Sequence, residues 1–235
     1  MKKIMFNDRY GLTKAVLEGR KTMTRRIIKT PRTMEGKDVY GFSVVKYPRI
    51  GVPIEVMALD ADGAQINNIL PKYKVGEVVA VAQSYMDAGY DPHMLQFIDI
   101  KEPTILPFSD GLPVLGYVEA PIMYHAGWKN KMFVHPTMMP HQIRITNVRV
   151  ERLQDISDED VYKEGFTKEA VNNGWGNYAY HNEAVLVYYD CLGRTKSIQS
   201  RYPKEAFATL FDKVSGVGTW DSNPWVFVYE FELVK

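Results

Sequence analysis

The sequence predicts an α+β protein in which a small mixed β-barrel is flanked by short helices. Three observations favour this fold class. Segments with a strand pattern recur along the chain, segments with helical spacing are few and short, and the two kinds do not alternate regularly. Regular alternation would instead be typical of a doubly wound parallel sheet, whereas a small mixed barrel is the expected closed form of such strands.

Three segments carry helix signals. Residues 9–18 place apolar side chains at helical spacing after an Asn-Asp pair that can cap a helix, and a glycine follows. A second helix begins after Ser157, whose hydroxyl can accept a hydrogen bond from the backbone three residues on, and it ends at Gly165. The third begins at Pro203 and is stopped by Gly216. We therefore expect three short helices.

Four segments predict strands. Residues 21–28 are rich in β-branched side chains, and residues 75–82 and 143–153 are rich in Val and Ile. Residues 225–234 alternate aromatic side chains with smaller or acidic ones, which is typical of a half-buried strand with an aromatic face. Residues 39–70 carry a weaker signal, for a hairpin with an Asp-Gly turn.

We interpret residues 1–235 as a single domain with insertions at about 85–142 and 166–202. The first insertion holds seven of the 13 prolines and six of the 11 methionines and has little periodicity. That composition is typical of a loop-rich segment rather than an independent domain. The second insertion is irregular and rich in aromatic residues. Either one could cover a binding cleft.

The composition excludes several classes of protein. Apolar residues make up 46% and charged residues 24%, as in globular proteins, so whole-chain disorder is excluded. No apolar run approaches the roughly 18 residues of a membrane helix, and the first residues do not form a secretory signal. The single cysteine, Cys191, cannot form an internal disulfide. We expect a cytoplasmic protein without a membrane partner.

Charge is distributed unevenly along the chain. The formal net charge is only +1, yet residues 1–37 hold eleven Lys and Arg side chains against three acidic ones. A local basic surface attracts phosphate groups even when the total charge is near zero. A solvated basic face without a ligand is the alternative.

Most recognisable catalytic and cofactor motifs are missing from the sequence. It contains no complete phosphate-binding glycine loop, no closely spaced metal ligands and no serine nucleophile elbow. We therefore predict no cofactor and no metal.

The clearest candidate site is the string from Gly19 to Arg26, which holds four cations and two hydroxyls in eight residues. A lysine amine whose pKa is lowered by neighbouring cations can remove a threonine proton, so that the hydroxyl attacks. Strand alternation would place Thr22, Thr24 and Arg26 on one face. The alternative is a basic strand edge that resists aggregation or binds phosphate.

This string, Gly-Arg-Lys-Thr-x-Thr-Arg-Arg, resembles the signature of the ASCH domain family, a relative of the PUA-like RNA-binding barrels. Two further blocks agree with it. Residues 148–165 resemble the family's central strand and following helix, and residues 207–231 resemble its closing helix and strand in phage and prophage members. Together the matching blocks cover about half of the chain.

The resemblance implies a barrel with a cleft lined by the basic signature. The family's hydrolytic members use a lysine, a threonine and a glutamate, which fall on Lys21, Thr24 and Glu164 of this chain. The implied roles are Thr24 as nucleophile, Lys21 as its base and Glu164 as a carboxylate that handles a proton or orients a partner. Arg26 would hold the substrate. Nucleic-acid or ligand contacts fall on Arg20, Thr22, Arg25 and Arg26.

Three functions remain open from the sequence. The first is binding of RNA or a nucleotide, with basic side chains on phosphates and Trp175, Tyr178 or Tyr180 stacked on bases unless these rings belong to the core. The second is hydrolysis, either of a modified nucleoside such as acetylated cytidine or of RNA phosphodiesters. The third is an interaction module with a vestigial cleft.

Overall fold

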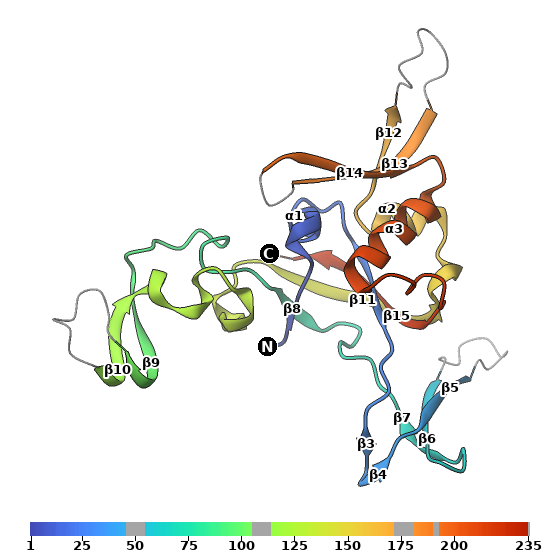
Figure 1. Cartoon of the computed structure of the whole chain (residues 1–235), viewed down its shortest axis with the longest axis horizontal. Coiled ribbons are helices and arrows are strands. Elements are labelled where there is room, and N and C mark those ends of the chain that lie inside the picture. The colour runs from blue at the N-terminus through green and yellow to red at the C-terminus, as the bar shows by residue number, and fades with distance from the viewer. Residues whose placement is uncertain (46–54, 105–113, 172–180, 190–192, 235) are drawn as a thin grey trace. The chain divides into compact units, whose positions relative to one another are not determined.

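The computed structural model describes residues 1–45, 55–104, 114–171, 181–189 and 193–234 (Figure 1). The chain divides into two compact units. The first comprises Met1–Phe6 and Val79–Gln142, and the second comprises Asn7–Val78 and Ile143–Val234.

The fold class predicted from the sequence is confirmed at its coarser level. Strands in several sheets predominate among the described residues, and the helices are few and short, so the protein is α+β. The described strands do not close into a barrel. No described helix combines the length and the apolar character that a membrane crossing requires.

Three antiparallel strands form the centre of the second unit. They are β2 (Met23–Ile27), β15 (Trp225–Leu233) and β11 (Gln142–Arg152), of which β11 belongs to this unit from Ile143 onward. Strand β15 lies in the middle and pairs with both of the others. The strand predicted over residues 225–234 is present, but residues 226–229 are all buried, so its centre is covered on both faces rather than half-buried as predicted.

The register of these strands decides which side chains share a face. Arg25 lies opposite Val228, which in turn lies opposite Arg149, so these three side chains share one face of the sheet. Thr24 lies opposite Tyr229, and both point to the other face because side chains alternate along a strand.

The three predicted helices are present in the second unit. Its helical segments are η1 (Asp8–Tyr10), α1 (Leu12–Leu17), η6 (Leu153–Asp155), α2 (Asp158–Lys163) and α3 (Pro203–Ser215). The helix expected over residues 9–18 is divided into η1 and α1, because Gly11 between them adopts a left-handed conformation with φ of 65°. The predicted cap of α2 is confirmed, since the Asp160 backbone N–H donates to the Ser157 hydroxyl at 3.1 Å.

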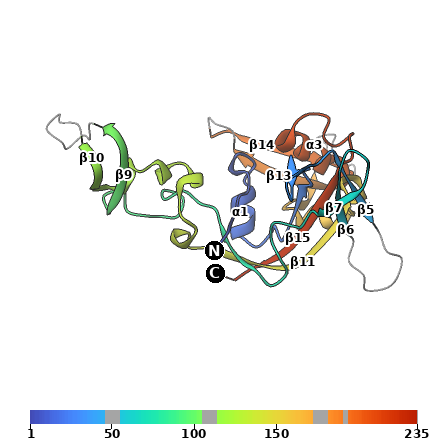
Figure 2. The same ribbon diagram turned by 90° about the horizontal axis from the view of Figure 1, so that it is seen from below.

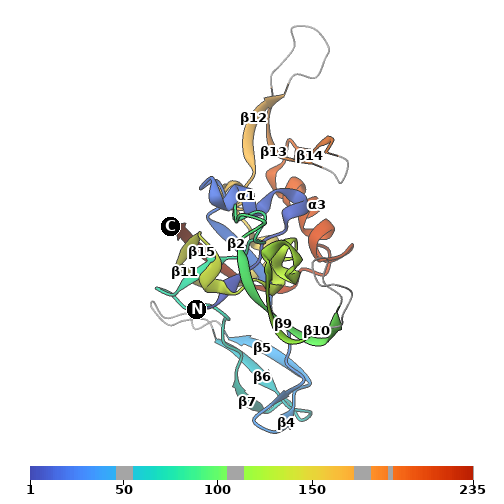
Figure 3. The same ribbon diagram turned by 90° about the vertical axis from the view of Figure 1, so that its left-hand side faces the viewer.

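Two smaller three-stranded sheets and a short hairpin complete the second unit. Their strands are β3 (Thr33–Met34), β4 (Lys37–Asp38), β5 (Gly41–Val45), β6 (Glu55–Leu59), β7 (Gln65–Asn68), β12 (Thr167–Val171), β13 (His181–Tyr189) and β14 (Thr195–Ser200). The sheet β5–β6–β7 contains the hairpin expected within residues 39–70, and Gly63 in its turn has φ of 78°. The sheet β12–β13–β14 runs through residues 166–202, which were expected to be irregular (Figure 3).

The first unit contains the proline-rich residues of the predicted 85–142 insertion. Its elements are β1 (Lys3–Ile4), β8 (Val78–Val81, in this unit from Val79), β9 (Leu95–Thr104), β10 (Val114–Pro121), η2 (Ile122–Tyr124), η3 (Ala126–Trp128), η4 (Lys131–Phe133) and η5 (Pro136–Met138). Strands β9 and β10 form an antiparallel ribbon (Figure 2). Four successive single-turn helices follow it, and they pack around Tyr85, Ile122 and Val134. The Lys3 ammonium ties this segment to β1 by donating to three backbone carbonyls at 2.7–3.0 Å.

Candidate functional site

The predicted basic string lies where α1 meets β2, against the end of α2. The backbone N–H of Lys21 donates to Ala15 O at 2.9 Å, which ties the string to α1. The backbone N–H of Thr22 donates to Lys163 O at 2.9 Å, and Lys21 forms an isolated β-bridge with Glu164. Two segments about 140 residues apart in the sequence are therefore joined through their backbones before any side chain contributes.

Lys21 and Glu164 also form a buried ion pair. The Lys21 Nζ lies 2.5 Å from Glu164 Oε2 and 2.9 Å from Glu164 O, and the two side chains are only 2% and 5% exposed. Gly165 lies beside this pair in a backbone conformation that favours glycine. Its φ is +109°, and a Cβ there would lie 3.4 Å from the Cβ atoms of both Ala15 and Lys21.

The surroundings of Lys21 favour its neutral form. Burial lowers the pKa of the Lys21 ammonium below its ordinary value, and the positive charges of Arg26 and Arg25 lower it further. The Glu164 carboxylate opposes this effect by its charge and its hydrogen bond. The net direction is downward, which is the direction that a general base requires.

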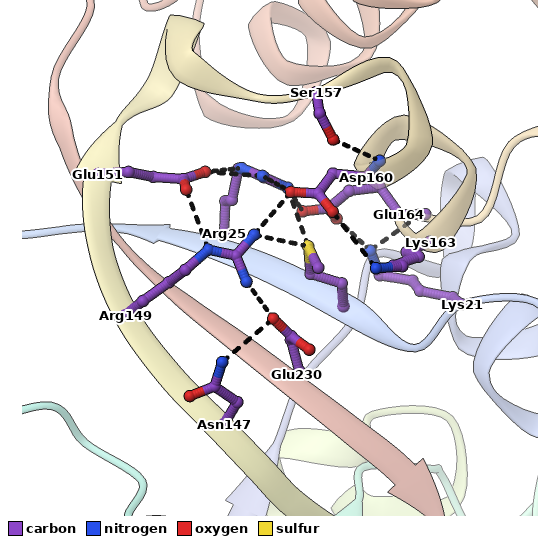
Figure 4. Close-up of polar contacts among 11 residues, drawn as sticks. Lys21, Arg25, Asn147, Arg149, Glu151, Ser157, Asp160, Lys163, Glu164 and Glu230 are labelled. Carbon is purple, nitrogen blue, oxygen red and sulfur yellow. Dashed lines mark hydrogen bonds and ion pairs between the residues drawn. The ribbon is translucent and has the colours of Figure 1, made fainter. Parts of the chain in front are cut away.

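The Arg25 guanidinium is fully buried and is held by three carboxylates (Figure 4). Its Nη1 donates to Glu164 Oε1 at 3.0 Å, and its Nη2 donates to Asp160 Oδ2 at 2.9 Å. Both Nε and Nη2 donate to Glu151 Oε1, at 2.9 and 2.7 Å. The ring of Phe207 lies 5.8 Å from the guanidinium carbon. The predicted ligand contact of Arg25 is therefore not available in this structure, because its donors are already engaged.

Arg25 belongs to a larger network of charged side chains on this face of the sheet. The network joins four cations and four carboxylates, so its formal charges balance: Lys21, Arg25, Arg149 and Lys163 with Glu151, Asp160, Glu164 and Glu230. Charge balance is what allows ions to be removed from water in a folded protein. Glu151, Asp160 and Arg149 carry no signal of this role in the sequence, because no local spacing connects them with Arg25.

Thr24 is placed differently from Lys21 and Glu164. It is buried at 5% exposure, and its backbone pairs with Tyr229 in the sheet. Within the described parts of the chain, the Thr24 hydroxyl has no hydrogen-bond partner, and neither Lys21 nor Glu164 reaches it. The structure therefore brings together Lys21 and Glu164, two of the three residues implied as catalytic. The third, Thr24, is not hydrogen-bonded to either of them.

Arg26 is exposed, and it lies on the same face of β2 as Thr24. The positive charge of Arg26 acts on two buried tyrosines, Tyr73 and Tyr229, whose rings meet edge to face at 5.3 Å. Burial nevertheless raises the pKa of Tyr73 to about 12 and raises that of Tyr229 as well. The Tyr229 hydroxyl accepts a hydrogen bond from the Lys72 N–H at 3.0 Å. The alternating aromatic pattern of residues 225–234 predicted that Tyr229 is buried. No sequence signal connected Tyr73 with the site.

The remaining predicted ligand residues lie at the margin of the site. Arg20 pairs with Glu18 at 2.5 Å and donates to Gly165 O at 3.2 Å, and Thr22 is half-buried. The candidate stacking residues Trp175, Tyr178 and Tyr180 lie outside the described residues, as does Cys191. Among the residues that the structure describes, no group of three or more His, Cys, Asp or Glu side chains could hold a metal ion.

Comparison with known proteins identified no relative of this chain. Searches against protein-family models, curated proteins and solved structures found no match to this chain.

Proposed function

We propose that the second unit is an ASCH-type, PUA-like domain that binds RNA or a nucleotide on the face of β2 that carries Thr24 and Arg26. The observation that carries this proposal is the Thr24 hydroxyl, which is buried without a hydrogen-bond partner among the described residues. Leaving such a group unpaired costs about 1–3 kcal/mol, and buried polar groups in folded proteins generally have partners. A polar atom of a ligand would supply the partner.

The charge beside Thr24 supports an anionic ligand. Arg26 is exposed two residues further along β2, on the same face, so its guanidinium can meet a phosphate while Thr24 contacts a sugar or base. Tyr73 and Tyr229 are buried, so they would form the floor of the site rather than stack on a base. Arg25 is left out of this proposed interface because its donors are held by carboxylates.

The test is a binding titration with fluorescently labelled single-stranded RNA and with nucleotides as competitors. Thr24→Val removes the hydroxyl while keeping the shape of the side chain, and we expect it to weaken binding by about tenfold, the equivalent of 1.4 kcal/mol. Arg26→Gln should also weaken binding, whereas Arg144→Gln should not, because Arg144 lies in an exposed pair with Glu232. Equal Kd values for all four proteins would exclude this face as the binding surface.

Hydrolysis of an acylated nucleoside is the second candidate, and the lowered pKa of the buried Lys21 favours it. The Thr24 oxygen would attack the acyl carbon while its proton passes to a neutral Lys21 amine. The C–N bond would then break as the leaving amine takes that proton, and water would release the acyl group from Thr24. These reaction steps require the Lys21 side chain to turn from Glu164 toward Thr24, because no hydrogen bond joins Lys21 to Thr24 in the described structure.

A further inference from the structure

We propose that Arg25 is a positioning residue of the Lys21–Glu164 pair: by holding Glu164 Oε1 it leaves Lys21 only the other carboxylate oxygen and keeps a second cation beside the ammonium. The geometry on which this rests is the division of one carboxylate between two cations. Glu164 Oε1 accepts from Arg25 Nη1 at 3.0 Å, and Oε2 accepts from Lys21 Nζ at 2.5 Å. All three side chains are at least 95% buried, so water does not screen this arrangement.

The rest of the network fixes Arg25 in this position. Glu151 on β11 engages Nε and Nη2, and Asp160 on α2 engages Nη2, which leaves Nη1 directed at Glu164. Asp160 is itself held by Arg149 at 2.6 Å. A planar guanidinium can satisfy three carboxylates in this way, whereas a lysine ammonium is a point charge without a fixed fork.

Two consequences follow for Lys21. With Arg25 present, the negative charge of Glu164 is shared, so it stabilises the Lys21 ammonium less than a dedicated carboxylate would. The Arg25 charge also acts directly on Lys21, in the same direction as that of Arg26. Both effects make the proton of Lys21 easier to remove. Among the described residues, the charged groups that act on Lys21 are Glu164 at the end of α2 and Arg25 and Arg26 on β2.

The role of this effect in catalysis rests on the hydrolase proposal, but its test needs no substrate. The pKa of Lys21 can be followed through the ¹³Cε signal of that lysine, which is assigned by its loss in Lys21→Met. Arg25→Met and Arg25→Gln remove the positive charge, and we expect each to raise the pKa of Lys21 by about one unit or more. Arg25→Lys keeps a charge but not the fork, so it should give an intermediate value. Arg144→Met, which removes an exposed arginine that is not among the charges acting on Lys21, should leave the value unchanged.

The outcomes distinguish positioning from simple structural support. A loss of stability without any change in the pKa of Lys21, in every Arg25 variant that folds, would overturn the proposal. Arg25→Lys keeps the test informative if the neutral variants do not fold. An inert wild-type enzyme would contradict the hydrolase proposal without altering these titrations, and an unchanged Lys21 pKa would overturn the positioning role even in an active enzyme.

Discussion

Lys21 and Glu164 are connected three times: by a β-bridge, by a side-chain ion pair at 2.5 Å and by a bond from Lys21 Nζ to Glu164 O at 2.9 Å. The contact joins the start of β2 to the end of α2. Because the side chains are buried and Glu164 is shared with Arg25, the pair belongs both to the stability of the unit and to the chemistry proposed for it.

Glu164→Gln should destabilise the protein by roughly 3–5 kcal/mol at neutral pH, because it leaves the Lys21 ammonium buried without its partner. The pKa of Lys21 is lowered in the folded state, so the unfolded chain binds more protons up to the ordinary lysine value of about 10.4. Stability of the variant should therefore recover as the pH rises from 7 toward 10. Urea unfolding at several pH values measures this. Glu232→Gln, in an exposed pair, is the control, and a deficit independent of pH would contradict the assignment.

Gly165→Ala should destabilise the protein by about 1–3 kcal/mol, because φ is +109°, a backbone conformation that residues with a side chain rarely adopt. Gly36→Ala is the matched control. Gly36 also has a positive φ, of +76°, but nothing lies within 4 Å of the position its Cβ would occupy. Thermal unfolding of both variants measures the two losses of stability. An unchanged Tm in Gly165→Ala would contradict the strain argument, and a larger loss there than in Gly36→Ala would show that the neighbours at 3.4 Å add to the strain.

Tyr73 should be among the last tyrosines to ionise, because burial raises its pKa to about 12. An acid whose pKa is higher in the folded state stabilises that state below the unfolded value of about 10, and this contribution is lost as the pH rises toward 12. Tyr73→Phe should remove absorbance change at 295 nm from the late part of an alkaline titration. Tyr40→Phe, at 71% exposure, should leave that late part unaltered. Tyr229 also has a raised pKa, so part of the late phase should remain in Tyr73→Phe, and an undiminished amplitude would contradict the burial argument.

Binding of RNA to the Arg26 face should weaken as salt rises. Removing one phosphate contact from a single-stranded complex reduces the slope of log K against log salt by about 0.7. We expect this change for Arg26→Gln but not for Arg144→Gln, and we expect little direct change for the buried Arg25 when its variants fold. Affinity measured at four or more salt concentrations supplies the slopes. An unaltered slope in Arg26→Gln would place the phosphate contacts elsewhere.

Hydrolysis of acetylated cytidine, if present, should be lost to a similar extent in Thr24→Val, Lys21→Met and the double variant, because residues acting as one unit have non-additive effects. Lys21→Arg should also be inactive, since a guanidinium does not give up its proton near neutral pH. Product formation measured by chromatography decides between these outcomes. An active Lys21→Arg enzyme would exclude lysine as the base.

The local features of this protein could be predicted from the sequence. The Ser157 cap, the stop at Gly165 and the alternating strand over residues 225–234 depend on interactions between residues close together in the chain, so their signals are local. The basic string was also visible, and so was the possibility that Lys21 has a lowered pKa. The β12–β13–β14 sheet was missed because its strands carry no clear alternation.

The partners of the site residues were decided only by the tertiary structure. Alternation along β2 predicts that Thr24 and Arg25 point to opposite faces, but it does not say what packs on each face. The packing of α2 and of the β11 face supplies Asp160, Glu164 and Glu151, and these carboxylates turn Arg25 from a candidate phosphate contact into a buried anchor. Charges more than 120 residues apart in the chain carry no sequence signal of their pairing, because only burial makes that pairing necessary.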